Sequence, residues 1–83
     1  MAAITIQSVT NLLPDQRATA IEVIGEGAKG GTHDWVVFFR RQGDVQGGYQ
    51  HRPAGGYHAE HLIPLEVKHA AEAEYRKAWG GSD

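Results

Sequence analysis

Hydrophobic and polar residues alternate near the start of the chain. Ile4 and Ile6 are separated by Thr5 and followed by Gln7, and this two-residue period is typical of a half-buried β-strand. We therefore predict a strand over residues 3–9. The middle of the chain differs, because residues 35–39 are apolar without interruption. Such a short apolar run is typical of a strand that is covered on both faces or contacts a partner, so we expect a central strand there, over residues 33–41.

A second strand is expected to pair with this central segment as a hairpin. After a turn, Val45, Gly47 and Tyr49 occupy alternating positions, which predicts a strand over residues 44–51. The glycines within it are typical of a bulge or an edge position. Residues 52–57 contain a proline and two glycines, and we expect them to form a loop.

The last part of the chain has the composition of a helix. Pro64 suits a helix start, and two glycines follow the segment 65–79. Within it, Val67, Ala71 and Tyr75 recur at helical spacing and define one apolar face. We therefore predict a C-terminal helix that packs on the sheet.

Residues 14–24 carry conflicting signals. Pro14, Asp15 and the glycine at position 25 are helix boundary signals, and they favour a helix over this segment. Four β-branched residues favour a strand instead: Thr19, Ile21, Val23 and Ile24. We predict the helix and keep the strand as the alternative.

These elements define an α+β fold in a single domain of residues 1–83. We predict a small antiparallel sheet of three strands packed against a C-terminal helix, in the order β-α-β-β-α. If residues 14–24 form a strand, the fold becomes a four-stranded meander closed by one helix.

Composition narrows the class of protein. The chain has 83 residues, of which 41% are hydrophobic and 22% charged, a balance typical of one globular domain with little room for a deep catalytic cleft. It has no Cys, so disulfides and thiolate metal sites are excluded. The N-terminal residues do not resemble a signal peptide and no apolar run could span a membrane, so we expect a cytoplasmic protein without membrane contact.

Three local patterns invite a chemical interpretation. Residues 25–30 read G-x-G-x-x-G, but a strand is expected next, where a dinucleotide-binding fingerprint requires a helix. Residues 60–65, Glu-His-Leu-Ile-Pro-Leu, resemble the opening of HNH nucleases, but the later Asn and metal-binding His of that family have no counterpart. Three histidines, His51, His58 and His61, surround a glycine-rich loop whose spacing does not define a zinc site. We therefore expect no metal, no cofactor and no catalytic residues.

The function expected by elimination is a non-enzymatic protein-binding module, such as a small stand-alone inhibitor or adaptor. One version is a phage or bacterial inhibitor of a nucleic-acid enzyme. The alternatives are a nucleic-acid-binding module that uses an Arg/Tyr-rich hairpin and, further, a small metal-dependent enzyme. A net charge of −2 gives only weak attraction to a phosphate backbone. Because interfaces are enriched in Arg and Tyr, the expected contact residues come from the middle of the chain. They are Arg40, Arg41, Tyr49, Arg52 and Tyr57.

Overall fold

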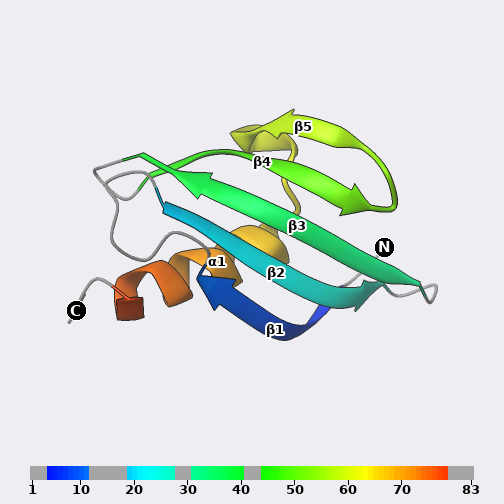
Figure 1. Ribbon diagram of the computed structural model, residues 1–83, viewed down its shortest axis with the longest axis horizontal. Helices are drawn as coiled ribbons and strands as arrows, with labels where there is room; N and C mark the ends of the chain where they lie inside the picture. The colour runs from blue at the N-terminus through cyan, green and yellow to red at the C-terminus, as the bar shows by residue number, and fades with distance from the viewer. Residues whose placement is uncertain (1–3, 12–18, 28–30, 41–43, 79–83) are drawn as a thin grey trace.

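The sheet contains five antiparallel strands whose order in space is their order in the chain (Figure 1). The computed structural model describes residues 4–11, 19–27, 31–40 and 44–78. The strands are β1 (Ile4–Asn11), β2 (Thr19–Gly27), β3 (Thr32–Phe39), β4 (Val45–Arg52) and β5 (Gly56–Ala59). A short 3-10 helix, η1 (Glu60–Leu62), then leads into α1 (Leu65–Ala78). The α+β class and the C-terminal helix are therefore confirmed.

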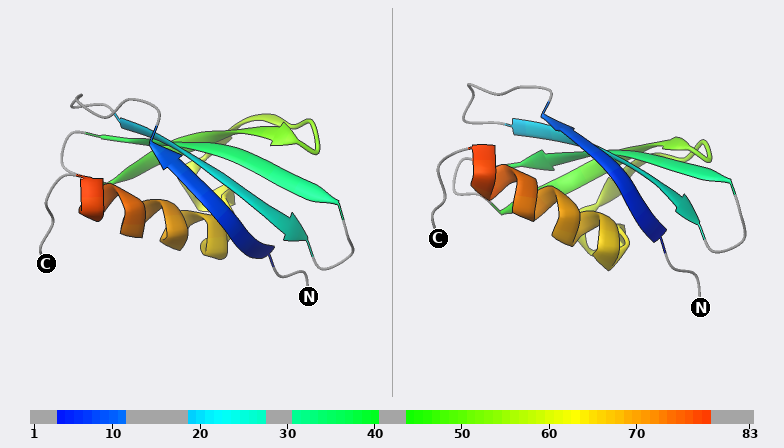
Figure 2. Two further views of the ribbon diagram at one scale, coloured as in Figure 1. Left: turned by 60° about the horizontal axis from the view of Figure 1, so that its bottom comes forward. Right: turned by 90° about the horizontal axis from the view of Figure 1, so that it is seen from below.

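Helix α1 covers one face of the sheet and lies against β1, β2 and β3 (Figure 2). Its apolar face carries Val67 and Ala71, which are fully buried, and Tyr75, whose ring stacks on Phe39 with 4.5 Å between ring centroids. The sheet contributes the other core side chains, which come mainly from β2, β3 and β4. These are Ile21, Val23, Trp35, Val37, Phe39 and Val45, with Ile63 added from the segment before α1. No helix in the described part of the chain is long and apolar enough to cross a membrane.

Strand β3 is the third of five, so the prediction of a central strand is confirmed. Trp35, Val37 and Phe39 point to the helix, because they belong to the core cluster that includes the helix residues. Side chains alternate along a strand, so Val36 and Phe38 point to the opposite face. Although the run is apolar on both sides, the described helix covers one side.

The predicted helix over residues 14–24 is wrong, because residues 19–27 form β2; residues 12–18 lie outside the described residues. Strand β2 pairs with β1 on one side and β3 on the other, so its backbone groups are used by two neighbours. Ile21 and Val23, which are two residues apart, are both fully buried. Their two-residue period and β-branched shape outweigh the helix boundary signals at the ends of the segment.

The predicted count of three or four strands is also wrong, and so is the order β-α-β-β-α. Part of the segment expected to be a loop, residues 52–57, belongs to β5, which pairs with β4 from Gly47↔Ala59 to Gln50↔Gly56. The chain reverses between β4 and β5, and the first residue of β5, Gly56, has a φ of 78°, in the left-handed region that favours glycine. The glycines therefore shape a hairpin. The predicted meander alternative has the correct local topology but lacks this fifth strand.

Candidate binding face

The sheet face opposite α1 is called here the open face, because no described helix lies against it. Register places its side chains at the positions that alternate with the core positions. From β1 to β5 the open face includes Thr10, Ala20, Glu22, Ile24, Asp34, Val36, Phe38, Gly47, Tyr49 and Tyr57. Two regions of different chemistry lie on it, an aromatic patch over β3, β4 and β5 and a carboxyl pair shared by β2 and β3.

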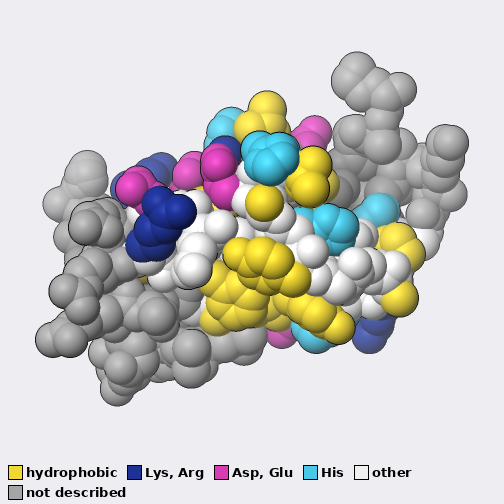
Figure 3. Space-filling model, turned by 90° about the horizontal axis from the view of Figure 1, so that it is seen from above, with side chains coloured by type: hydrophobic (Ala, Val, Ile, Leu, Met, Phe, Trp, Pro, Cys, Tyr) yellow, Lys and Arg dark blue, Asp and Glu magenta, His cyan; other side chains and the backbone are white. Residues whose placement is uncertain are grey.

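The aromatic patch consists of Phe38, Tyr49, His51 and Tyr57. Tyr49 and Tyr57 are directly opposite each other on β4 and β5, and they are 42% and 58% exposed. The Tyr57 ring stacks near that of Phe38, with 6.5 Å between centroids, and His51 packs edge-on against Tyr49 at 5.0 Å. Seen from above, from the β5 side of the sheet, both hydrophobic side chains and histidines are exposed (Figure 3). The patch is thus held by cross-strand contacts on a sheet.

Gly47 makes room for the Tyr57 ring. A Cβ atom at Gly47 would lie 2.6 Å from Cζ of Tyr57 and 2.8 Å from the carbonyl oxygen of His58. These separations are too short for carbon atoms, so only a residue without a side chain lets the ring lie flat across β4. The Tyr57 hydroxyl donates a long hydrogen bond of 3.4 Å to the carbonyl oxygen of Gln46. Tyr57 therefore lies along the sheet surface.

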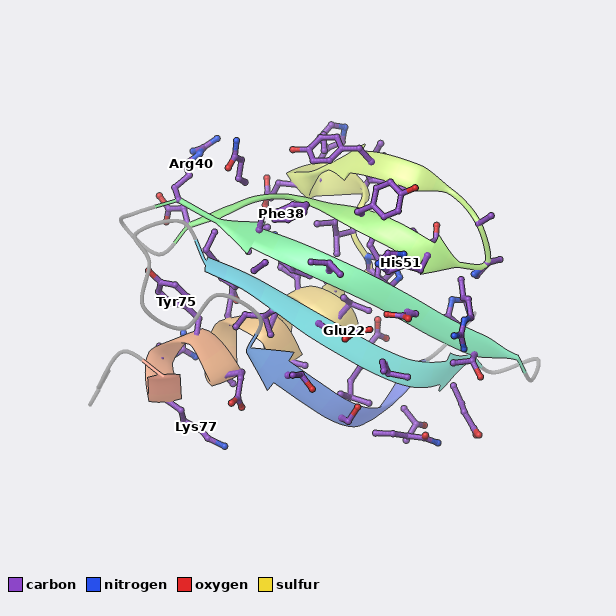
Figure 4. The ribbon with its side chains drawn as sticks, viewed as in Figure 1. Glu22, Phe38, Arg40, His51, Tyr75 and Lys77 are labelled. Atoms are coloured by element: carbon purple, nitrogen blue, oxygen red, sulfur yellow. The ribbon has the colours of Figure 1, made fainter. Side chains whose placement is uncertain are left out.

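The carboxyl pair is formed by Glu22 on β2 and Asp34 on β3. Asp34 is 7% exposed, and its Oδ1 atom has no hydrogen-bond partner among the described residues. A side-chain hydrogen bond with Asp34 raises the pKa of Glu22 above its ordinary value of 4.5. Partial burial and the charge of Asp34 act in the same direction, whereas His51 and Arg52 oppose the shift. Figure 4 shows that Glu22, Phe38 and His51 come from three neighbouring strands.

A raised pKa in the folded state has a definite effect on stability. The folded protein binds the Glu22 proton more tightly than the unfolded chain does, and this difference stabilises the fold. The stabilisation is complete below about pH 4.5 and is lost as the pH rises through the raised pKa. We expect Glu22→Gln to remove this loss, because the amide cannot ionise. The melting temperature of the variant should therefore rise relative to the parent as pH increases from 4 to 7 in a thermal-melting series. Glu26→Gln, an exposed position on the same strand, is the control; equal pH profiles for both variants would contradict the prediction.

The predicted contact residues do not converge on one place. Tyr49 and Tyr57 lie side by side in the aromatic patch. Arg40 follows the end of β3, where its backbone N–H donates to the carbonyl oxygen of Asp44 at 2.8 Å. Arg52 is at the far end of β4, opposite Asp34, roughly 25 Å from the Arg40 turn at about 3.3 Å per residue. Arg41 lies outside the described residues.

The three histidines lie in different surroundings. His51 belongs to the aromatic patch, whereas His58 points to the opposite face and packs against Trp35 with 5.2 Å between ring centroids. The Nε2 atom of His58 is buried and has no hydrogen-bond partner among the described residues. His61 is exposed in η1. In the described ranges, no group of three or more His, Asp or Glu side chains is placed to hold a metal ion.

The glycine-rich segment and the HNH-like segment both contain residues with contacts inside the fold. Gly25 lies within β2, opposite Ile6 on one side and His33 on the other, and residues 28–30 lie outside the described residues. In the HNH-like segment, the Glu60 carboxylate accepts a 2.5 Å hydrogen bond from Nζ of Lys68 in α1. This contact lowers the pKa of Glu60 and raises that of Lys68. Glu60 thus connects η1 to the helix.

Two parts of the open face were missed from the sequence. Phe38 belongs to the apolar run, but assigning it to the open face requires knowing which alternate residues of β3 point to the core. Trp35, the largest core residue, could have indicated this. Glu22 and Asp34 are 12 positions apart in the chain, and their contact depends on the β2–β3 register. No local signal connects them.

Comparison of the chain with protein-family models, curated proteins and solved structures finds no match. Function is therefore inferred from the geometry of the open face.

Proposed function

We propose that this protein is a non-enzymatic protein-binding module that contacts its partner through the aromatic patch. The observation that carries the proposal is the exposed pair Tyr49 and Tyr57 on a sheet face that no described helix covers. Tyrosine is enriched in protein interfaces because it buries a large area while losing few rotatable bonds. Paired strands hold the two rings in position before binding, which lowers the entropic cost of association.

The surroundings of the patch support a protein partner over a nucleic acid. Sheets that bind single strands combine stacked aromatic rings with a positively charged path for the backbone. Here the aromatic rings are present and His51 contacts Tyr49, whereas Arg52 lies at the end of β4 opposite Asp34. However, the carboxyls of Glu22 and Asp34 occupy the neighbouring part of the same face, where they would repel phosphates. A folded inhibitor or adaptor remains the preferred form of the proposal.

The patch is tested by substituting both tyrosines. We expect Tyr49→Ser/Tyr57→Ser to reduce recovery of the partner at least tenfold, since a hot-spot residue contributes about 2 kcal/mol or more. The measurement is affinity capture from the native host, with quantitative mass spectrometry of the proteins retained by parent and variant. Circular dichroism checks that the variant remains folded.

A matched control removes similar exposed apolar surface elsewhere. Leu62 and Leu65 are 58% and 60% exposed and lie in η1 and α1. Leu62→Ser/Leu65→Ser should leave capture unchanged. Equal loss with both double variants would contradict the proposed surface. Loss of capture after nuclease treatment, with a steep salt dependence that Arg40→Ala/Arg41→Ala flattens, would favour the nucleic-acid alternative.

A further inference from the structure

The two edge strands of the sheet, β1 and β5, differ in how well they are protected against pairing with another strand. Strand β5 has four residues and begins with a glycine, whereas β1 has eight. The β1 sequence, Ile-Thr-Ile-Gln-Ser-Val-Thr-Asn, contains no charge, no proline and no glycine. Sheet edges are usually protected by short length, charge or proline, because free backbone N–H and C=O groups pair with other strands. Apart from its bulge, β1 has none of these features, and no described strand other than β2 pairs with it. Its outer side lies foremost in Figure 2.

Strand β1 is nearly symmetric about its midpoint. Thr5 and Thr10 are equally far from the centre, and so are Ile6 and Val9. In an antiparallel pair of two identical strands, a two-fold axis between Gln7 and Ser8 places each Thr5 opposite Thr10 of the other copy. It likewise places each Ile6 opposite Val9. Of the possible antiparallel registers, this one pairs all eight residues.

The bulge in β1 makes this register consistent with both faces. The register with β2 shifts between Ile6 and Ser8, which inverts the alternation between the two halves of β1. As a result, Thr5 and Thr10 both lie opposite glutamates of β2 and share the open face. Without the shift, an odd spacing of five would place the two threonines on different faces.

The apolar residues of β1 are incompletely covered. Ile6 and Val9 pack against the core but are only half-buried, because they lie at the edge of the core. Pairing with a second copy would create two contacts between Ile6 of one copy and Val9 of the other, both on the helix side of the sheet. It would also create two contacts between Thr5 and Thr10 of different copies, both on the open face. Both kinds of cross-strand pair stabilise antiparallel sheets.

We propose that β1 is a homodimer interface, in which two copies pair antiparallel about an axis between Gln7 and Ser8 to form one continuous ten-stranded sheet. This surface is separate from the aromatic patch and does not depend on the proposed function.

The absence of cysteine from the chain allows a direct test of the register. We expect a mixture of the single variants Thr5→Cys and Thr10→Cys to form mostly the mixed disulfide under mild oxidation. In the proposed pair, positions 5 and 10 of different copies are direct neighbours. Two copies of position 5, however, are roughly 17 Å apart, which is too far for a disulfide. Homodisulfides as frequent as mixed ones would overturn the register.

Sedimentation equilibrium over a concentration series tests the dimer itself. The parent should sediment at twice the mass of one chain at high concentration. Thr5→Lys/Thr10→Lys should weaken dimerisation about tenfold or more, since it places like charges opposite each other twice. The control Thr32→Lys/Gln46→Lys adds the same charge at exposed positions of β3 and β4, and it should leave the dimer intact. A parent that is monomeric throughout, or a dimer that the β1 lysines do not weaken, would overturn the proposal.

Discussion

Phe39→Asp should abolish the cooperative unfolding transition, leaving the chain unfolded at 25 °C. Phe39 is 1% exposed and stacks on Tyr75, so it connects the central strand to the helix. Truncating a buried Phe costs about 3–5 kcal/mol, and a buried unpaired carboxylate adds a further penalty. A small domain is typically stable by only about 5–15 kcal/mol, so the combined loss is expected to exceed what the fold can tolerate. Thermal and urea unfolding followed by circular dichroism measure the effect.

The adjacent residue provides the matched control. Phe38 is half-buried on the open face, where a carboxylate remains in contact with water. Phe38→Asp should therefore keep a cooperative transition at a reduced melting temperature. If Phe39→Asp melted within a few degrees of the parent, β3 could not be the centre of the core.

Gly47→Ala should destabilise the protein by about 1–3 kcal/mol, as expected when a methyl group is forced into a packed site. The added Cβ meets both the Tyr57 ring and the carbonyl oxygen of His58, and the backbone of β5 cannot move away without breaking its pairing with β4. The free energy of unfolding, measured by urea titration, should fall accordingly.

A second substitution separates the two contacts of that methyl group. Tyr57→Ala removes the ring but leaves the carbonyl oxygen of His58, so Gly47→Ala should cost less in the Tyr57→Ala background but still destabilise. Comparing the destabilisation by Gly47→Ala in the parent and in the Tyr57→Ala background shows how much of it comes from the contact with the ring. An unchanged or stabilised Gly47→Ala protein would show that β5 does not lie against β4 as described.

Local sequence patterns were sufficient for some elements of the fold and insufficient for others. The apolar run 35–39 and the helical spacing of Val67, Ala71 and Tyr75 predicted the central strand and the C-terminal helix. The segment 14–24 was assigned to the wrong class, because the burial of Ile21 and Val23 between two neighbouring strands is a tertiary effect. Strand β5 was missed because Gly56 and its neighbours resemble a loop when the pairing partner is unknown.

The candidate site shows the same division. Composition alone selected Tyr49 and Tyr57, and the β4–β5 register brings them together. Composition also selected Arg40 and Arg52, which the length of β4 separates. The contact between Glu22 and Asp34 could not be predicted, since a register error of one residue on either strand would turn the two carboxyls to opposite faces.

The meander topology also governs how the chain folds during synthesis. Each strand can pair with the preceding strand as soon as it is complete, because neighbours in space are neighbours in the chain. The apolar face of the sheet, however, waits for α1, the last described element, which returns to lie against β1 and β2. A nascent or truncated chain that stops before Leu65 would expose Ile21, Trp35 and Val37 to water, and such surfaces recruit chaperones and aggregate. Loss of the final helix should therefore appear in cells as degradation of the whole protein.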